Sequence, residues 1–133
     1  MGIFKSLFGD SSSNKKENEN QKLIPWKELK SSDQLKTIRE DSKNRTQAIF
    51  KHSTRCGISK MALRNFESSF DLEGEQVDLY YLDLLNHKDI SQDIAAEFQV
   101  FHESPQFIVI RNGETVHHSS HSAITPQVLY QYI

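Results

Sequence analysis

The chain holds one cysteine, Cys56, and its place in the sequence is where chemistry is expected. The segment before it, Thr46–His52, is β-prone and partly alternating in polarity. After it, apolar residues recur at helical spacing and predict a helix with one buried face: Ile58, Met61, Ala62, Phe66 and Phe70. Cys56 therefore lies where a helix begins, beside N–H groups that have no intrahelical partner. A thiolate is stabilised there, and the thiolate is the nucleophilic form.

The neighbours of Cys56 support the same interpretation. Arg55 and Gly57 flank it, and Lys51 and His52 lie upstream, which predicts polar and cationic surroundings that favour a thiolate. The alternative is a small, inert core residue, which is what a lone cysteine most often is. Position and neighbours together favour a reactive thiol.

Length and composition limit the classes of function. A chain of 133 residues with net charge −2 is a single domain by length, and its charge gives no reason to expect nucleic acid or an anionic membrane as partner. One cysteine cannot form an internal disulfide, which fits a reducing compartment. There is no apolar run of about 18 residues and no signal-peptide pattern, so a cytoplasmic location without a transmembrane segment is expected.

The first 22 residues differ from the rest. Residues 1–9, MGIFKSLFG, would place four apolar side chains on one face of a short helix, and residues 10–22 contain no apolar residue. Residues 1–22 are therefore predicted to be a flexible tail with a short amphipathic start. Residues 1–9 could make weak contact with a membrane surface or a partner, or could simply be a frayed terminus. The folded domain is expected to span residues 23–133.

The rest of the domain alternates between strand and helix signals. A short edge strand is expected at Trp26, after Pro25, and a helix capped by Ser32 is expected to run to about Lys43. The helix after Cys56 is expected to end near Gly74, and strand 76–84 follows. Residues 89–100 are predicted to form a helix with Ser91 as a candidate cap.

The C-terminal part predicts a hairpin and a last helix. Residues 107–110 form an apolar run typical of a strand buried on both faces, and Asn112-Gly113 favours a two-residue turn into an edge strand at 114–118. Thr125-Pro126 is a cap followed by proline at the first helical position. Alternating elements predict an α/β fold with a central mixed β-sheet, parallel except at the closing hairpin, flanked by helices on both faces.

At this point the sequence resembles the thioredoxin-like superfamily. The resemblance rests on the thiol at the helix start, the helix near Ile94–Val100, Ser104-Pro105, the strand that follows and the Asn112-Gly113 turn. Within that superfamily, the stretch Lys51–Ser59, KHSTRCGIS, is most similar to the YtxJ family, the monothiol bacilliredoxins of the bacillithiol system. The resemblance covers residues 24–133.

The resemblance implies roles for particular residues. Cys56 would be the nucleophile, and Ser59 would stand at the second position of a CxxS motif where dithiol relatives have a resolving cysteine. Its hydroxyl could donate a hydrogen bond to the sulfur or act as an ordinary helix cap. Pro105 would be a cis-proline facing the thiol, with Ser104 offering backbone groups to a substrate disulfide.

Residues beside the thiol would also contact substrate in this interpretation: Thr54, Arg55 and Gly57. Arg55 could pair with the malate of bacillithiol. Gly57 departs from the family, which usually has proline after the cysteine. Glycine keeps an N–H that can point at the thiolate but loosens the loop, and the redox poise is therefore left open.

The implied function is thiol–disulfide exchange that removes bacillithiol from mixed disulfides on client proteins. Bacillithiol would be a co-substrate with no bound cofactor, and a low-molecular-weight thiol or a reductase would regenerate Cys56. The alternative is a non-catalytic thioredoxin-like binding or redox-sensing module, which Gly57 favours. No metal site is expected, because His117 and His118 would point to opposite faces of a strand.

Overall fold

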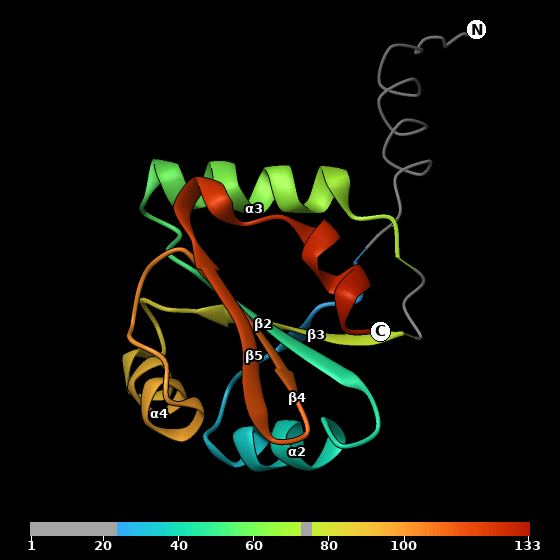
Figure 1. The fold of residues 1–133 in the computed structure, drawn as a ribbon. Helices are drawn as coiled ribbons and strands as arrows, with labels where there is room; N and C mark the ends of the chain where they lie inside the picture. The colour runs from blue at the N-terminus through green and yellow to red at the C-terminus, as the bar shows by residue number, and fades with distance from the viewer. Residues whose placement is uncertain (1–23, 73–75) are drawn as a thin grey trace, which may run out of the picture.

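The computed structural model of the chain describes residues 24–72 and 76–133. The predicted tail, the start of the domain at Leu23 and the helix-ending Gly74 lie outside the described residues. Five strands form one mixed sheet in the order β1-β3-β2-β4-β5 (Figure 1). The strands are β1 (Lys27–Glu28), β2 (Thr46–His52), β3 (Val77–Asp83), β4 (Gln106–Arg111) and β5 (Glu114–Ser120).

Strand β2 is the centre of the sheet and is buried along its whole length. It pairs in parallel with β3 and antiparallel with β4, and β1 forms the edge predicted near Trp26. The sequence predicted antiparallel pairing at the closing hairpin alone, whereas β4 is antiparallel to β2 as well as to β5. The reason is the connection: residues 99–105 return the chain to the end of β2, and Gln106 starts β4 opposite Lys51.

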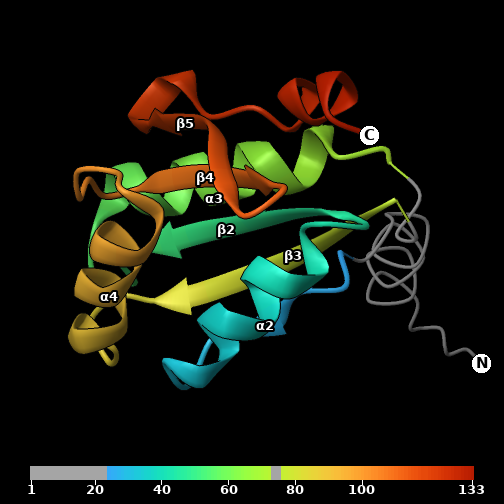
Figure 2. The same cartoon turned by 60° about the horizontal axis from the view of Figure 1, so that its bottom comes forward.

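Helices cover both faces of the sheet, which confirms the predicted α/β architecture (Figure 2). On one face, α2 (Asp33–Asp41) and α4 (Lys88–Phe98) bury Leu35, Ile38, Ile90, Ile94 and Phe98. On the other face, α3 (Gly57–Ser69) buries Ala62 and Phe66, and the 3-10 helix Pro126–Gln131 adds Leu129. Among the described residues, no helix is both long and apolar enough to cross a bilayer.

Three helix starts show where cap signals succeed and fail. Thr125 accepts the backbone N–H of Gln127, as predicted, although the helix it begins is 3-10. Ser32 makes no side-chain cap bond; instead, the Gln34 side-chain oxygen accepts the N–H groups of residues 30 and 31. Ser91 is buried inside α4, which begins three residues earlier. Ser32 is thus the N-cap residue of α2, as predicted, but without a side-chain bond. The prediction that Ser91 caps a helix was wrong, because α4 already begins at Lys88.

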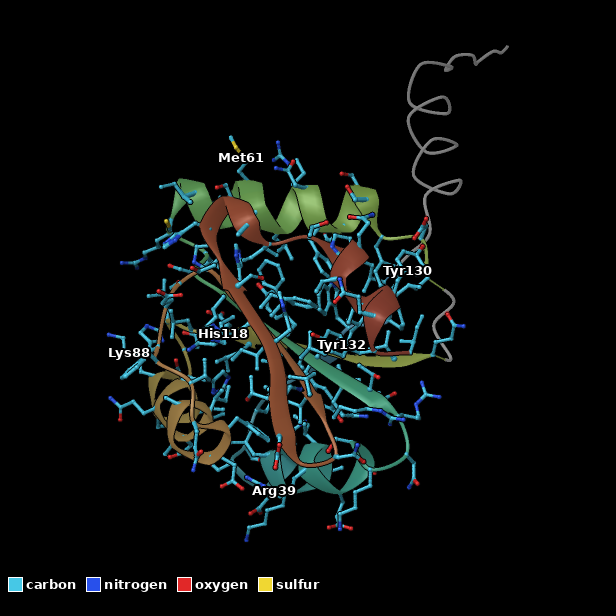
Figure 3. All side chains as sticks on the ribbon, viewed as in Figure 1. Arg39, Met61, Lys88, His118, Tyr130 and Tyr132 are labelled. Atoms are coloured by element: carbon cyan, nitrogen blue, oxygen red, sulfur yellow. The ribbon has the colours of Figure 1, made fainter. Side chains whose placement is uncertain are left out.

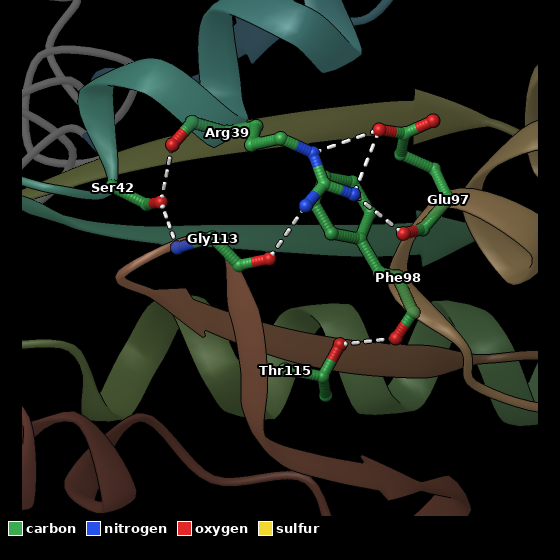
Figure 4. Close-up of polar contacts among 6 residues, drawn as sticks. All are labelled: Arg39, Ser42, Glu97, Phe98, Gly113 and Thr115. Carbon is green, nitrogen blue, oxygen red and sulfur yellow. Dashed lines mark hydrogen bonds and ion pairs between the residues drawn. The ribbon is translucent and has the colours of Figure 1, made fainter.

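Arg39 joins α2, α4 and the β4–β5 hairpin at the end of the sheet where β2 begins (Figure 4). Its guanidinium donates to the Glu97 carboxylate at 2.8 Å, to the Glu97 carbonyl at 2.7 Å and to the Gly113 carbonyl at 3.0 Å. It also lies over the Phe98 ring, 5.3 Å from the centroid. Asn112 and Gly113 both have positive φ, so the predicted two-residue turn is confirmed.

Candidate functional site

Cys56 lies where the sequence predicts, immediately before the first residue of α3. Its backbone is extended (φ −104°, ψ 122°), its carbonyl accepts the N–H of Lys60 at 3.0 Å, and its own N–H donates to the Ser53 carbonyl at 3.2 Å. The side chain is half-buried, so it is held by its loop and still reachable from solvent. The sulfur thus stands at the positive end of a 13-residue helix whose first turn contains no acidic side chain.

The hydroxyl of Ser59 is used inside the protein. It accepts the backbone N–H of Ser53 at 3.0 Å and shares a hydrogen with Nδ1 of His52 at 2.7 Å. Neither bond is to the sulfur, and neither is a helix cap. Ser59, wholly buried, therefore ties Ser53, the first residue of the loop before Cys56, to the end of β2. A part for Ser59 in exchange at the thiol stays a prediction.

The two residues expected to make the surroundings cationic behave differently in the structure. His52 is 4% exposed, and burial lowers its pKa despite the opposing charges of Asp83 and Glu67, so the ring is neutral at pH 7. Lys51, which precedes His52 in β2, faces the other side of the sheet, where its ammonium lies 2.7 Å from Nδ1 of His102. Neither therefore supplies a positive charge on the α3 side, and Arg55, which is exposed, is the cation adjacent to Cys56 in the chain.

The Ser104–Pro105 peptide bond is cis, as the resemblance implied. Pro105 is buried, and its carbonyl accepts the N–H of His121 at 3.3 Å, which ties the loop before β4 to the end of β5. Ser104 is half-buried. The loop is thus fixed on one side by the sheet and leaves Ser104 at its surface.

The remaining predicted site residues are at the surface beside the thiol. Thr54, Arg55 and Gly57 are all exposed. A Cβ atom added at Gly57 would meet no atom within 4 Å, so there is open space for a β-carbon at this position. The substrate contacts expected of these three residues remain predictions.

Ile58 and Met61 were predicted to be buried, and this was wrong: they are 61% and 65% exposed. The stripe of α3 that faces the sheet is Ser59, Ala62 and Phe66, so Ile58 and Met61 fall one position off it. Met61 points away from the body of the protein (Figure 3). With Gly57, His121 and Ile124 they line a hollow of about 400 Å³ that starts at the residue following Cys56.

Sequence reasoning missed this apolar surface because spacing alone cannot fix which of two adjacent stripes faces the core. Because Ser59 is polar, it was not recognised as part of the buried stripe of α3. As for metals, the described part of the chain contains no group of three histidine, cysteine, aspartate or glutamate side chains placed to hold an ion.

Comparisons with known proteins agree with this geometry. The model of a family described as monothiol bacilliredoxin BrxC matches residues 27–129. A solved structure, described as a proposed oxidoreductase with a thioredoxin fold, is 36% identical over 78% of this chain and 89% of that one, with a TM-score of 0.66.

Two thioredoxins are similar in fold. That of Malassezia sympodialis is 23% identical over 84% of this chain and 93% of its own, with a TM-score of 0.61. That of Trypanosoma brucei brucei is 21% identical over 84% and 90%, with a TM-score of 0.58. At these identities the likeness concerns the fold, and it extends over nearly all of both thioredoxins.

Proposed function

The chain belongs to the monothiol bacilliredoxin family of thioredoxin-fold disulfide oxidoreductases, and on this basis we propose that Cys56 removes bacillithiol from mixed disulfides on client proteins. The observation that carries the proposal is the place of the thiol. Cys56 is half-buried at the start of α3, inside the matched region, in a chain with no second cysteine.

The exchange is a single displacement at sulfur. The Cys56 thiolate attacks the bacillithiol sulfur of the client mixed disulfide, and the client sulfur–sulfur bond breaks. A new disulfide joins Cys56 to bacillithiol, and the client leaves as a thiolate that takes a proton from water. One disulfide is lost and one is formed, so this step needs no other oxidant or reductant.

Regeneration requires a partner from outside the chain, because there is no second thiol to attack the capped Cys56. We propose that a low-molecular-weight thiol or a reductase supplies it. A free thiol would attack the bacillithiol sulfur, leave with bacillithiol as a new disulfide and release the Cys56 thiolate. Such reduced thiols are maintained in the cytoplasm, which is where we place the reaction.

Clients would approach across the surface that joins the thiol to the hollow beside Ile58 and Met61. These two exposed apolar side chains lie in the first turns of α3, and the hollow begins at Gly57. Exposed apolar surface of this kind marks sites of protein contact. Ser104, Thr54 and Arg55 are proposed to contact the client disulfide, with Arg55 available to the carboxylates of bacillithiol.

The test uses a short peptide with one cysteine capped by bacillithiol. Mixing it with the reduced protein should transfer the cap to Cys56, seen by intact mass, and release free peptide thiol about tenfold faster than the same protein unfolded in urea releases it. Cys56→Ser is the blank. The same peptide capped by glutathione serves as the comparison for the choice of small thiol.

Two results would count against the proposal. Transfer no faster than in the unfolded protein would mean that the fold does not activate the thiol, and the chain would then be better explained as a binding or redox-sensing module. Equal rates with the bacillithiol and glutathione caps would overturn the preference for bacillithiol while leaving disulfide exchange intact.

A further inference from the structure

Lys51 is the most unusual charged residue that the structure describes. Its side chain is 0% exposed, at the end of β2 that leads to Cys56. Its ammonium lies 2.7 Å from Nδ1 of His102 and donates to the Gln106 side-chain oxygen at 3.0 Å. Among the described residues, no carboxylate pairs with it, so a buried charge is held by neutral groups. Such an arrangement costs the folded state desolvation energy.

The partners of Lys51 all belong to, or support, the loop that leads to Pro105. Gln106 directly follows Pro105 and is the residue paired with Lys51 across β2 and β4. The Gln106 side chain reaches back into the loop, donating to the Phe101 carbonyl at 2.9 Å and accepting the Glu103 N–H at 3.3 Å. The ammonium therefore supports a side chain that fixes residues 101–106 as one unit.

His102 extends this unit to α4. Its Nδ1 lies 3.2 Å from the hydroxyl of Ser91, which is buried in the helix. Because an ammonium has only donors, Nδ1 must accept from Lys51, and the imidazole must be neutral. The groups that face the ammonium are thus His102 and Glu103 from the loop, Ser91 from α4 through His102, and Gln106 from β4.

We propose that Lys51 is a positioning residue for exchange at Cys56: its ammonium holds residues 101–105, and with them the Ser104–Pro105 peptide, in the geometry that receives a client disulfide. This inference rests on the proposed function and adds a residue, on the sheet face opposite α3, on which that function depends. Lys51 touches neither sulfur; it acts through Gln106 and His102.

The titration of the two facing groups supports this role. Burial lowers the pKa of Lys51 to about 8, against the raising influence of Glu103. Burial, and next the nearby Lys51 charge, lower the pKa of His102 below its ordinary value of 6.5. A charged ammonium facing a neutral imidazole therefore exists between the two pKa values. Release of the loop would hydrate Lys51 and return its pKa toward 10.5, so a rise in pH favours the held loop. Acid should release the loop instead, because protonated His102 can no longer accept from the ammonium.

The first experiment compares two reactions of the same thiol. Iodoacetamide is small and reports the thiolate alone, whereas a bacillithiol-capped peptide must also dock against the loop. In Lys51→Met the peptide rate should fall about tenfold while the iodoacetamide rate stays within about twofold, because misplaced contacts slow the docked reaction alone. Lys88→Met, at an exposed lysine of α4 that points outward (Figure 3), is the matched control and should change neither rate.

The second experiment needs no variant of uncertain stability. In the wild-type protein, the ratio of the peptide rate to the iodoacetamide rate cancels the thiolate fraction of Cys56. That ratio should not fall between pH 7 and 9.5, and should fall below pH 6 as His102 takes a proton, toward the value for Lys51→Met, whose own ratio should not change with pH. If the variant fails to fold, the wild-type profile decides alone.

Each other outcome is decisive. Peptide and iodoacetamide rates that fall equally in Lys51→Met would mean that Lys51 acts on the thiol. A wild-type ratio that stays flat down to pH 5, or that falls above pH 8, would mean that the ammonium–imidazole contact does not hold the loop. Either result overturns the proposal. A wild-type protein that takes up no bacillithiol would instead overturn the proposed function, and the role of Lys51 would fall with it.

Discussion

Arg39 and Lys51 each tie a loop to the central sheet, one at each end of β2, and their charges are satisfied in different ways. Arg39 is partly exposed and meets a carboxylate, two carbonyls and an aromatic face. The hairpin it holds is closed further by Ser42, whose hydroxyl accepts the Gly113 N–H at 2.8 Å. At this end of the sheet the Glu97 carboxylate and the Glu97 and Gly113 carbonyls all accept from the Arg39 guanidinium.

Lys51 is fully buried, and within residues 24–72 and 76–133 its ammonium meets an imidazole and an amide. A carboxylate is available nearby, since Glu103 lies in the same loop and its charge acts on Lys51, yet no carboxylate in the described part of the chain forms an ion pair with the ammonium. The end of the sheet that carries no reactive group is thus closed by an ion pair, and the end that carries Cys56 keeps a charge at a cost in stability. Local rules of good design are broken most often where function requires it.

The largest expected effect concerns how stability depends on pH at the thiol end. In the unfolded chain Lys51 keeps its proton up to the usual pKa of 10.5, whereas in the folded protein the pKa is about 8. Between these values the unfolded state binds more protons, so the free energy of unfolding rises with pH. The total rise is about 3 kcal/mol, since a pKa change of one is worth about 1.4 kcal/mol.

Chemical denaturation of the wild-type protein and Lys51→Met from pH 7 to pH 10.5 measures this rise. Over this pH range the free energy of unfolding of the wild type should rise by about 3 kcal/mol more than that of the variant, because all other titrating groups are common to both. At pH 7 the two should be close in stability, as the variant loses two hydrogen bonds but also the buried charge. If the free energies of unfolding of the two proteins changed with pH in parallel, burial would not lower the pKa of Lys51.

The second expected effect is a loss of stability at the end of the sheet that Arg39 holds. Arg39→Met removes a carboxylate pair, two carbonyl bonds and the contact with Phe98, and should lower the free energy of unfolding by about 2 kcal/mol. The loss should be the same from pH 7 to pH 9, and the ratio of the peptide rate to the iodoacetamide rate should not change. Lys36→Met, an exposed site in the same helix, is the control.

A fall in that ratio in Arg39→Met would remove the distinction between the two ends. It would mean that the hairpin end also positions the substrate loop, through α4 and residues 99–105. A stability loss without a rate change would confirm that the two cations serve different purposes.

Local signals in the sequence predicted the parts of the fold that have a local cause. Asn112-Gly113 predicted its turn because both residues tolerate positive φ, and the burial of residues 107–110 in β4 follows from their apolar run. The cis bond at Pro105 came from resemblance, since proline alone favours trans. Cys56 at the helix start came from the change of period on either side of it.

The errors have a non-local cause. Whether Ile58 or Ser59 faces the sheet depends on how α3 is rotated, which spacing alone does not determine. Likewise, Lys51 in a β-prone stretch suggests a surface cation, and only the pairing of β2 with β4 shows it facing Gln106 and His102. The hydrogen-bond partners of Lys51 lie 51 and 55 residues away in the chain, so no local sequence pattern predicts them.

The smallest expected effect on stability concerns Gly57, the residue that follows Cys56. Proline there should raise the free energy of unfolding by about 0.5 to 1 kcal/mol, because it restricts the unfolded chain at a first helical position. The geometry permits it: a Cβ at Gly57 meets nothing within 4 Å, and Cys56 before it already has the extended backbone that proline demands.

Gly57→Ala separates the two properties of proline, because alanine also restricts the chain but keeps the N–H beside the thiol. Both variants should be more stable than the wild type in chemical denaturation, and the peptide rate should stay within about twofold in each, since Lys51 rather than loop looseness governs docking. If Gly57→Pro alone slowed the iodoacetamide reaction, the Gly57 N–H would be a contact of the thiolate. The thiol end would then hold two charges by neutral groups: an anion by a donor at Gly57, and the Lys51 cation by the acceptors of His102 and Gln106.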